Sequence, residues 1–542
     1  MERRDNKRSW SASNGEPASS SSSSSTSPAA VLDGGVILSK ILSDHKMTWD
    51  GFLNDIWQTQ PFVFSWNESK SRSSTLPGSI DGCTDPTATT VLAKDDAGRW
   101  RDEFMTKDPW REIVAQGWNI VLALLEKSQA NLLDSTTTKS CNNGRPMHGF
   151  EAPLIFQNQQ VLSVEECETL YRNNLFGAYL DGASMVFNHA DLLNAHLAFL
   201  CQDFQQKRTE SIGFPHVYAN CYLTPPKSQT APPHADDRDV LIFQVLGKKQ
   251  WQIYSQVPVP YPYPHEQVGK DGLEVPSVIL QGPKAFDDVL YPGDILYVPR
   301  GMVHQAQSTD DSLSFHVTVA IATHDWTLAR NMSRQIEATL MRIVDYRTSI
   351  LPFTGTDREA TVAKIQDQIN NAFQRLQKEV TPQIVLQDIE TRIDNHNREA
   401  FSDRMSLIHS ARVAGGIDHG LIKTNAITTE NDGNTMLQRV GSVAASSITY
   451  TSIIRAATPS EKAYAQSTLM CGTSSGLNVR EEVADAVMKI ISTIKVSVGT
   501  NQRFQVANLR SVVDNPCPQL CDLTLLCLAK RTVELGVCAV VV

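Results

Sequence analysis

Long apolar runs, closely spaced cysteines and an excess of basic residues are all lacking in this 542-residue sequence. No apolar run reaches the roughly 18 residues that a membrane-spanning helix needs, so we expect no such helix and no membrane partner. The ten cysteines include no CxxC pair. Cys517, Cys521 and Cys527 lie among leucines, which favours buried thiols in a reducing compartment over a metal site or disulfides. The formal net charge of −10 argues against tight binding to naked nucleic acid, although a local basic surface stays compatible with it.

The first 35 residues are of low complexity, and Ser19 to Ser25 are all serine. Such a segment buries too little apolar surface to fold, which predicts a disordered tail over 1–35. Its basic residues, Arg3, Arg4, Lys7 and Arg8, are interrupted by acidic ones. A nuclear-import signal, an organellar transit segment and a merely solvated tail therefore stay open as alternatives.

Short strands follow one another between residues 216 and 321, separated by Gly and Pro turns. This pattern predicts a small antiparallel barrel of the double-stranded β-helix type. The N-terminal flank predicts a helix and a strand over 36–66, and a helix over 110–126 that leads into a polar loop over 127–148. A Pro-rich loop is expected over 255–288. The strands that the pattern predicts within the barrel are Val240–Leu246, Lys249–Tyr254, Ile295–Val298 and Leu313–Ile321.

Residues after Asp325 change to a helical period. Apolar residues recur at three and four over 332–344 and 362–380, which predicts two long amphipathic helices. These helices have little nearby β sequence to cover, so they pack either on each other or on a second chain. A polar loop over about 415–435 and helices near 481–495, 504–513 and 519–529, followed by a strand-like end, predict a small α+β domain at the C-terminus.

Two histidines and one aspartate stand out within the predicted barrel. His234 and Asp236 form an H-x-D pair, so in extended chain both point to the same side. The segment YPGDILYVPRGMVH brings His304 from a later strand. Two imidazoles and one carboxylate form the facial triad of non-haem Fe(II) oxygenases, which leaves coordination positions open for a co-substrate and O2. The pattern therefore predicts an iron site at His234, Asp236 and His304.

Lys249 alternates with Trp251 and Ile253, so it shares their inward face, whereas Lys248 is expected on the surface. A lysine inside a barrel is costly unless it is paired. A dicarboxylate such as 2-oxoglutarate would supply the counter-charge. His316 lies on a polar strand face, and a satisfied core histidine and a direct role in the pocket both stay open for it.

The segments YLTPPKSQTAPPHADD, GKKQW and YPGDILYVPRGMVHQA resemble the JmjC-type ribosomal oxygenases, which are also described as bifunctional histidyl-hydroxylases and lysine demethylases. The resemblance implies that His234, Asp236 and His304 bind Fe(II) and that Lys249 pairs with 2-oxoglutarate. It also implies that Asn220 and Thr318 lie near this co-substrate and Tyr222 near the substrate. The family's usual Tyr between the ligands is Ala235 here, and a serine expected after the polar strand face is Ala320. These departures bear on the identity of the peptide substrate.

The fold class implied is α+β, with four parts. These are a disordered tail over 1–35, a JmjC/cupin catalytic domain with its flank over 36–325, a helical dimerisation region over 326–412, and a linker with a winged-helix-like domain over 413–542. The resemblance implies a homodimer that hydroxylates a histidine of a ribosomal protein, using O2 and 2-oxoglutarate, in the nucleus or nucleolus. A cytoplasmic or organellar location stays open.

Three other functions are compatible with these motifs. The same site would demethylate a histone lysine if the target were an N-methyl group. A cupin-like binding module without catalysis is the second alternative, and the intact triad with Lys249 counts against it. A winged-helix adaptor for nucleic acid is the third, and the isoelectric point of about 5.7 disfavours it.

Overall fold

The computed structural model describes the greater part of the chain. The described residues are 36–65, 109–135, 153–171, 175–205, 214, 216–270, 273–348, 358–413, 448, 452–457, 459, 462, 477, 479–498, 502–514, 516–517, 519–535 and 537–540. The predicted tail over 1–35 and the predicted loop over 415–435 lie outside these residues.

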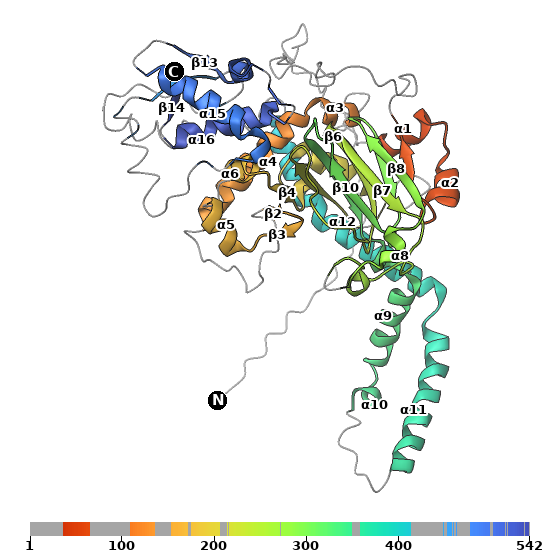
Figure 1. Cartoon of the computed structure of the whole chain (residues 1–542). Helices are drawn as coiled ribbons and strands as arrows, with labels where there is room; N and C mark the ends of the chain where they lie inside the picture. Colours follow the sequence, from red (N-terminus) through yellow and green to blue (C-terminus); the bar gives the residue numbers. More distant parts are fainter. Residues whose placement is uncertain are drawn as a thin grey trace, which may run out of the picture.

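Two antiparallel sheets form the centre of the molecule (Figure 1). The larger sheet has the strand order β1-β9-β6-β11-β5-β4-β2-β3, and the smaller has the order β10-β7-β8. This arrangement confirms the antiparallel cupin-type barrel at the level of sheets and covering helices. The strands are β1 (Phe62–Phe64), β2 (Leu154–Gln157), β3 (Gln160–Val161), β4 (Ser184–Phe187), β5 (Val217–Thr224), β6 (Asp239–Gly247), β7 (Lys249–Tyr254), β8 (Lys284–Leu290), β9 (Ile295–Val298), β10 (His304–Ser308) and β11 (Ser314–Ile321).

Strand β11 has different surroundings on its two faces. Phe315, Val317 and Val319 pack into the core between the large sheet and helix α7 (Ala195–Gln205). Ala320 joins a second core, which contains Ile242 of β6 and Trp251 of β7 and so lies between the two sheets. Because side chains alternate along a strand, His316 and Thr318 face the barrel interior together with Ala320. This alternation gives the barrel a polar stripe within an apolar wall.

Several predicted boundaries differ from the structure. The helix expected over 110–126 is two helices, α3 (Pro109–Ala115) and α4 (Gly117–Ser135), so α4 continues into the segment predicted as loop. A Cβ atom added to Gly117 would lie 2.7 Å from Cγ1 of Val245, so the chain needs glycine where it passes β6. The segment 255–288 predicted as loop contains a short helix, α8 (Ser277–Leu280), and the start of β8.

Helices α9 (Leu328–Leu340), α10 (Val344–Arg347) and α11 (Arg358–Glu379) form an arm that projects from the barrel, and α12 (Pro382–Val413) leads back from it (Figure 1). The predicted amphipathic helices are thus present. Their boundaries as a separate dimerisation region, 326–412, stay a prediction. Helix α12 belongs to both parts of the molecule, because it contacts α9 in the arm and packs against α7 beside the barrel.

Arg404 fastens the C-terminal half of α12 to the barrel. It is 2% exposed, and its Nε lies 2.8 Å from Oδ2 of the buried Asp191. Its guanidinium also donates to the side chain of Gln205 and to the carbonyl oxygen of Val217. Breaking such a buried pair generally costs about 3–5 kcal/mol, because it leaves one charge without a partner. The arm is therefore anchored in the core through its last helix.

The C-terminal part consists of strands and helices that contact the N-terminal flank. The elements include β12 (Ile453–Ala456), α15 (Glu481–Val496), β13 (Phe504–Gln505), a 3₁₀ helix (Val506–Val512), α16 (Asp522–Glu534) and β14 (Cys538–Val540). Helix α16 packs against α6 (Leu175–Leu180), and Lys530 Nζ lies 3.3 Å from Oε1 of Glu126 on α4. The helices expected over 504–513 and 519–529 are thus a strand with a 3₁₀ helix and a later α-helix. The winged-helix assignment stays a prediction.

Of the three cysteines predicted to be buried thiols, one is buried and two are half-buried. Cys527 is buried in α16, while Cys517 and Cys521 are half-buried. Within the described residues, all cysteines are free thiols. None of the helices described here is both long enough and apolar enough to cross a membrane.

Candidate metal centre

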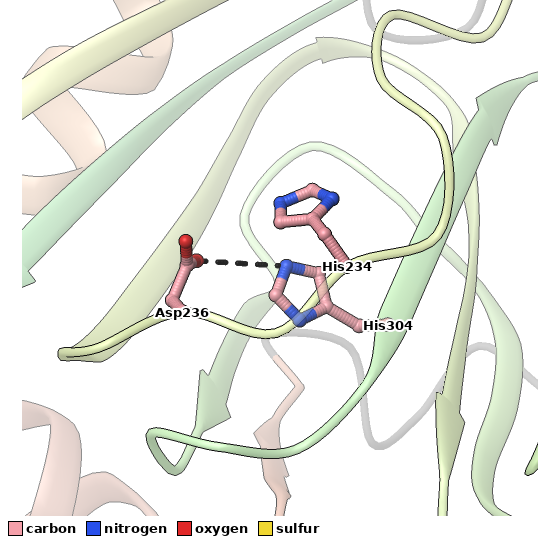
Figure 2. Close-up of side chains that lie close together, drawn as sticks. All are labelled: His234, Asp236 and His304. Atoms are coloured by element: carbon pink, nitrogen blue, oxygen red, sulfur yellow. Dashed lines mark ion pairs between the residues drawn. The ribbon is translucent and has the colours of Figure 1, made fainter. Parts of the chain in front are cut away.

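The structure brings together the three residues that the sequence singled out. His234, Asp236 and His304 each offer one ligand atom, and these atoms lie within 4.8 Å of one another. Figure 2 shows the two imidazoles and the carboxylate turned toward one another, with Nε2 of His304 3.7 Å from Oδ2 of Asp236. His304 begins β10, and His234 pairs with it in an isolated antiparallel bridge. The H-x-D pair and the distant His304 thus form one cluster.

The backbone fixes which ring nitrogen each histidine presents. Nδ1 of His234 lies 2.8 Å from the carbonyl oxygen of Pro232, and Nδ1 of His304 lies 3.0 Å from that of Met302. A carbonyl oxygen only accepts, so each Nδ1 carries the proton and each Nε2 keeps its lone pair free. Histidine ligands in metal sites are held by the same kind of contact on the second ring nitrogen. The residues present therefore fit a metal ion.

The charge state of the cluster also suits a cation. Desolvation lowers the pKa of His304, and desolvation together with the charges of Lys270 and His304 holds the pKa of His234 well below its usual range. Desolvation raises the pKa of Asp236, but the charges of Lys270 and of the two histidines outweigh it and lower this pKa. Both imidazoles are thus neutral and the carboxylate is ionised at neutral pH, which is the state that ligands require.

Lys249 lies inside the barrel, as its alternation with Trp251 predicted. Its side chain is 2% exposed, and its Nζ lies 3.1 Å from Oγ1 of Thr224 on β5. Desolvation lowers the pKa of Lys249 to about 7. Lys248, by contrast, is exposed and pairs with Asp311 at 3.1 Å. Among the described residues no carboxylate pairs with this buried ammonium, which is therefore suited to receive an anion.

The other predicted pocket residues lie on the strands that face Lys249. Asn220 and Thr318 are cross-strand partners on β5 and β11, and Oδ1 of Asn220 accepts the backbone N–H of His189 at 3.0 Å. Desolvation and the charge of Asp236 raise the pKa of the Tyr222 phenol. The effect of Asp236 indicates that Tyr222 lies near the triad. The structure therefore places Asn220, Thr318 and Tyr222 on the barrel wall, while their contacts with a ligand stay a prediction.

His316 stacks on Tyr222, with ring centroids 4.7 Å apart and planes within 6°. It is 2% exposed, and the edge of Trp251 lies against it at 5.5 Å. Among the described residues, neither Nδ1 of His316 nor Nε1 of Trp251 has a hydrogen-bond partner. Buried polar atoms normally have one. Two orphaned polar atoms next to Lys249 indicate a pocket for a polar ligand.

Two further residues were not found from the sequence. Lys270 donates to Oδ1 of Asp236, and Thr224 contacts the ammonium of Lys249. Lys270 lies in a loop 34 residues after Asp236, where no periodic pattern marks its direction. Thr224 lies at the end of β5, two residues after Tyr222. Because side chains alternate along a strand, this spacing could have predicted that Thr224 points into the barrel.

The antiparallel sheets form a cupin-type fold, and the two histidines and one aspartate that they bring together are a candidate metal site. Within this class, residues 193–327 match the family model described as the JmjC domain. The match includes the whole triad, Lys249 and Thr318. The matched residues make up about a quarter of the chain.

Curated relatives carry one common name. A protein of Drosophila pseudoobscura pseudoobscura, "Bifunctional lysine-specific demethylase and histidyl-hydroxylase NO66", is 42% identical over 104 residues, which are 19% of this chain and 10% of that protein. A protein of Dictyostelium discoideum with the same name is 30% identical over 183 residues, covering 33% of this chain and 34% of that protein. The chain thus spans from a tenth to a third of the length of these relatives.

A solved structure, YcfD, "a Ribosomal oxygenase from Escherichia coli in complex with Cobalt and 2-oxoglutarate", aligns over 91% of this chain and 98% of its own. The sequence identity is 11%, and the TM-score is 0.28.

We expect the triad to bind one divalent metal ion and to lose it when any ligand is removed. His304→Ala and Asp236→Ala should each weaken Mn(II) binding by about 10–100-fold or more, since even residues that only support ligands have effects of this size. Titration calorimetry measures the affinity. His265→Ala is the control, because this exposed histidine lies outside the triad. Wild-type affinity in either ligand variant would place the metal elsewhere.

Proposed function

We propose that this protein is an Fe(II)- and 2-oxoglutarate-dependent protein hydroxylase. The observation that carries the proposal is one barrel that holds both the triad of His234, Asp236 and His304 and the buried ammonium of Lys249. A metal held by two imidazoles and one carboxylate keeps three positions open, which suits a chelating co-substrate and O2. When bound, Fe(II) with 2-oxoglutarate would activate O2 to an oxidant strong enough to hydroxylate a C–H bond.

The residues of the chain would perform the binding and positioning. The backbone carbonyls of Pro232 and Met302 orient the two imidazoles, so that both Nε2 atoms would be available to a bound metal. Lys249 would pair with the far carboxylate of 2-oxoglutarate, and Oγ1 of Thr224 would hold the ammonium in place. The apolar wall around Trp251, Ile242 and Ala320 would exclude water from the reacting atoms.

A protein side chain is the substrate that we propose, and a histidine of a ribosomal protein is the specific target. The support is the name histidyl-hydroxylase that the relatives carry. Tyr222 would lie beside this side chain, because its phenol is close enough to the triad to sense the charge of Asp236. By the same resemblance we propose a nuclear or nucleolar location. Demethylation of a histone lysine is the alternative, since the relatives' name includes it.

We also propose that the arm mediates a homodimer. On α11, Ile365 and Leu376 are half-buried and Ala372 is buried, whereas Val362, Ile369 and Phe373 form a second apolar stripe that is 57%, 42% and 67% exposed. Exposed apolar stripes of this kind mark interfaces, and two-fold dimers are the commonest closed assembly. A second copy would cover a face that α9 leaves open.

The hydroxylase proposal predicts an added oxygen atom on a ribosomal protein in cells that contain this chain. Mass spectrometry of ribosomal proteins from cells with wild-type chain, without it, and with Asp236→Ala tests this expectation. The added oxygen should appear on a histidine only with the wild type. A histone that loses a methyl group in the same comparison would instead support the alternative. Succinate release from 2-oxoglutarate by the purified protein separates both from a binding module without catalysis.

Lys249 predicts how the affinity for 2-oxoglutarate depends on pH. Its ammonium must be charged to pair with a carboxylate, but its pKa in the free pocket is about 7. Above pH 7 binding therefore takes up a proton, and the affinity should fall with rising pH by up to about tenfold per unit. Calorimetry with the Mn(II)-loaded protein, in buffers of different ionisation enthalpy, measures both affinity and proton uptake. Lys249→Met should bind weakly at every pH without proton uptake. A wild-type affinity that stays constant from pH 7 to 9 would contradict the pairing.

The dimer proposal predicts that charge on the exposed stripe of α11 yields monomers. Ile369→Asp combined with Phe373→Asp should halve the mass seen by light scattering and leave helical content unchanged, since both side chains are exposed in the single chain. Gln374→Asp is the matched control, because it adds a charge at another exposed position of α11. A wild-type protein that is monomeric at micromolar concentration would exclude the dimer.

A further inference from the structure

Lys270 contacts one of the candidate metal ligands, Asp236, yet it belongs to no predicted site. Its ammonium donates to Oδ1 of Asp236 and to Oε1 of Gln267, the latter at 3.3 Å. A positive charge of the chain itself therefore lies against the cluster that a metal cation would enter.

The segment that carries Lys270 is tied to the ligand segment. The backbone N–H of Ala235 donates to the carbonyl oxygen of Val268 at 2.8 Å. Gly269 has a φ of +83°, and a Cβ there would lie 2.4 Å from the carbonyl oxygen of Pro233 and 2.6 Å from Cα of His234. Only glycine allows this approach. The backbone of Lys270 is thus held beside the triad. The conformation of this loop places its ammonium next to Asp236.

Charge decides what happens when a divalent ion binds. At equal distance, the repulsion between an ammonium and a divalent cation is twice the attraction between an ammonium and one carboxylate. The single negative charge of Asp236 cannot neutralise both cations. The side chain of Lys270 is 37% exposed, so its ammonium can turn into solvent while the backbone stays in place. Leaving Asp236 is therefore favourable for Lys270 once a metal is bound.

We infer that Lys270 competes with the metal for Asp236, and that its ammonium turns into solvent when a metal binds. This inference rests on the metal centre of the proposed function and deepens it. Lys270 balances the negative charge of Asp236 while no metal is bound. Because metal binding breaks this ion pair, the net free energy gained on metal binding is smaller. Lys270 therefore sets the metal affinity of the site, at a value below what the three ligands alone would give.

Metal titrations and amine labelling test this role without any measurement of turnover. Lys270→Met should bind Mn(II) about tenfold more tightly than wild type, the size of effect expected when a partly screened charge a few ångströms away is removed. Lys270→Arg, which keeps the charge, should stay within about threefold of wild type. Lys248→Met is the matched control, because it removes the same charge from a surface pair with Asp311 and should leave the affinity unchanged.

The wild-type protein supplies the second readout. Acylation by an amine-reactive ester, followed by peptide mass spectrometry, should modify Lys270 slowly in the metal-free protein and several-fold faster in the Mn(II)-loaded protein, with Lys248 as the internal reference. An affinity of Lys270→Met that is equal to or weaker than wild type overturns the inference, as does labelling of Lys270 that does not rise on loading. If wild-type protein binds no Mn(II) at all, the metal centre itself is wrong, which is a different outcome from either of these.

Discussion

The two histidines of the metal centre are joined through their own backbones. The N–H of His234 donates to the carbonyl oxygen of His304 at 3.1 Å, and the N–H of His304 donates back to that of His234 at 2.9 Å. This pair of hydrogen bonds fixes the distance between the two Cα atoms, so the imidazoles start from a set separation before any metal binds. Asp236 is held to the same frame, because its carbonyl oxygen accepts the N–H of Gly301 at 2.9 Å. The main-chain hydrogen bonds therefore organise the candidate ligand set, and a metal would meet three side chains that already lie close together.

The pocket beside this frame follows from the pairing of β10 with β7. His304 lies opposite Ile253, Ala306 opposite Trp251 and Ser308 opposite Lys249. Each step of two residues along these strands advances by nearly 7 Å on the same face. The backbone of Lys249 thus lies two such steps along the barrel from the position opposite His304.

The sequence was sufficient for the parts that depend on local pattern. The H-x-D pair, the turn before His304 and the alternation of Lys249 with Trp251 all act within a few residues, and each side chain lies where these patterns predict. Strands β8 and β10 were not predicted, because KAFDDVL and HQAQS carry no clear apolar alternation and are strands through pairing with β7. The break at Gly117 has a tertiary cause, its close approach to Val245. Lys270 was missed for the same reason, since the loop that aims it is shaped by contacts with Pro233 and His234 rather than by its own sequence.

Helix α12 joins the projecting arm to the barrel without an intervening loop. A continuous helix of 32 residues is about 48 Å long. Its first turns lie beside α9, whereas Arg404, near its other end, is locked to Asp191 of the barrel. Helix α12 therefore connects the arm directly to the barrel. If two arms pair, the distance and angle between the two metal centres become fixed quantities. A large substrate would then meet two sites of constant spacing, and its own shape would decide whether both can be used.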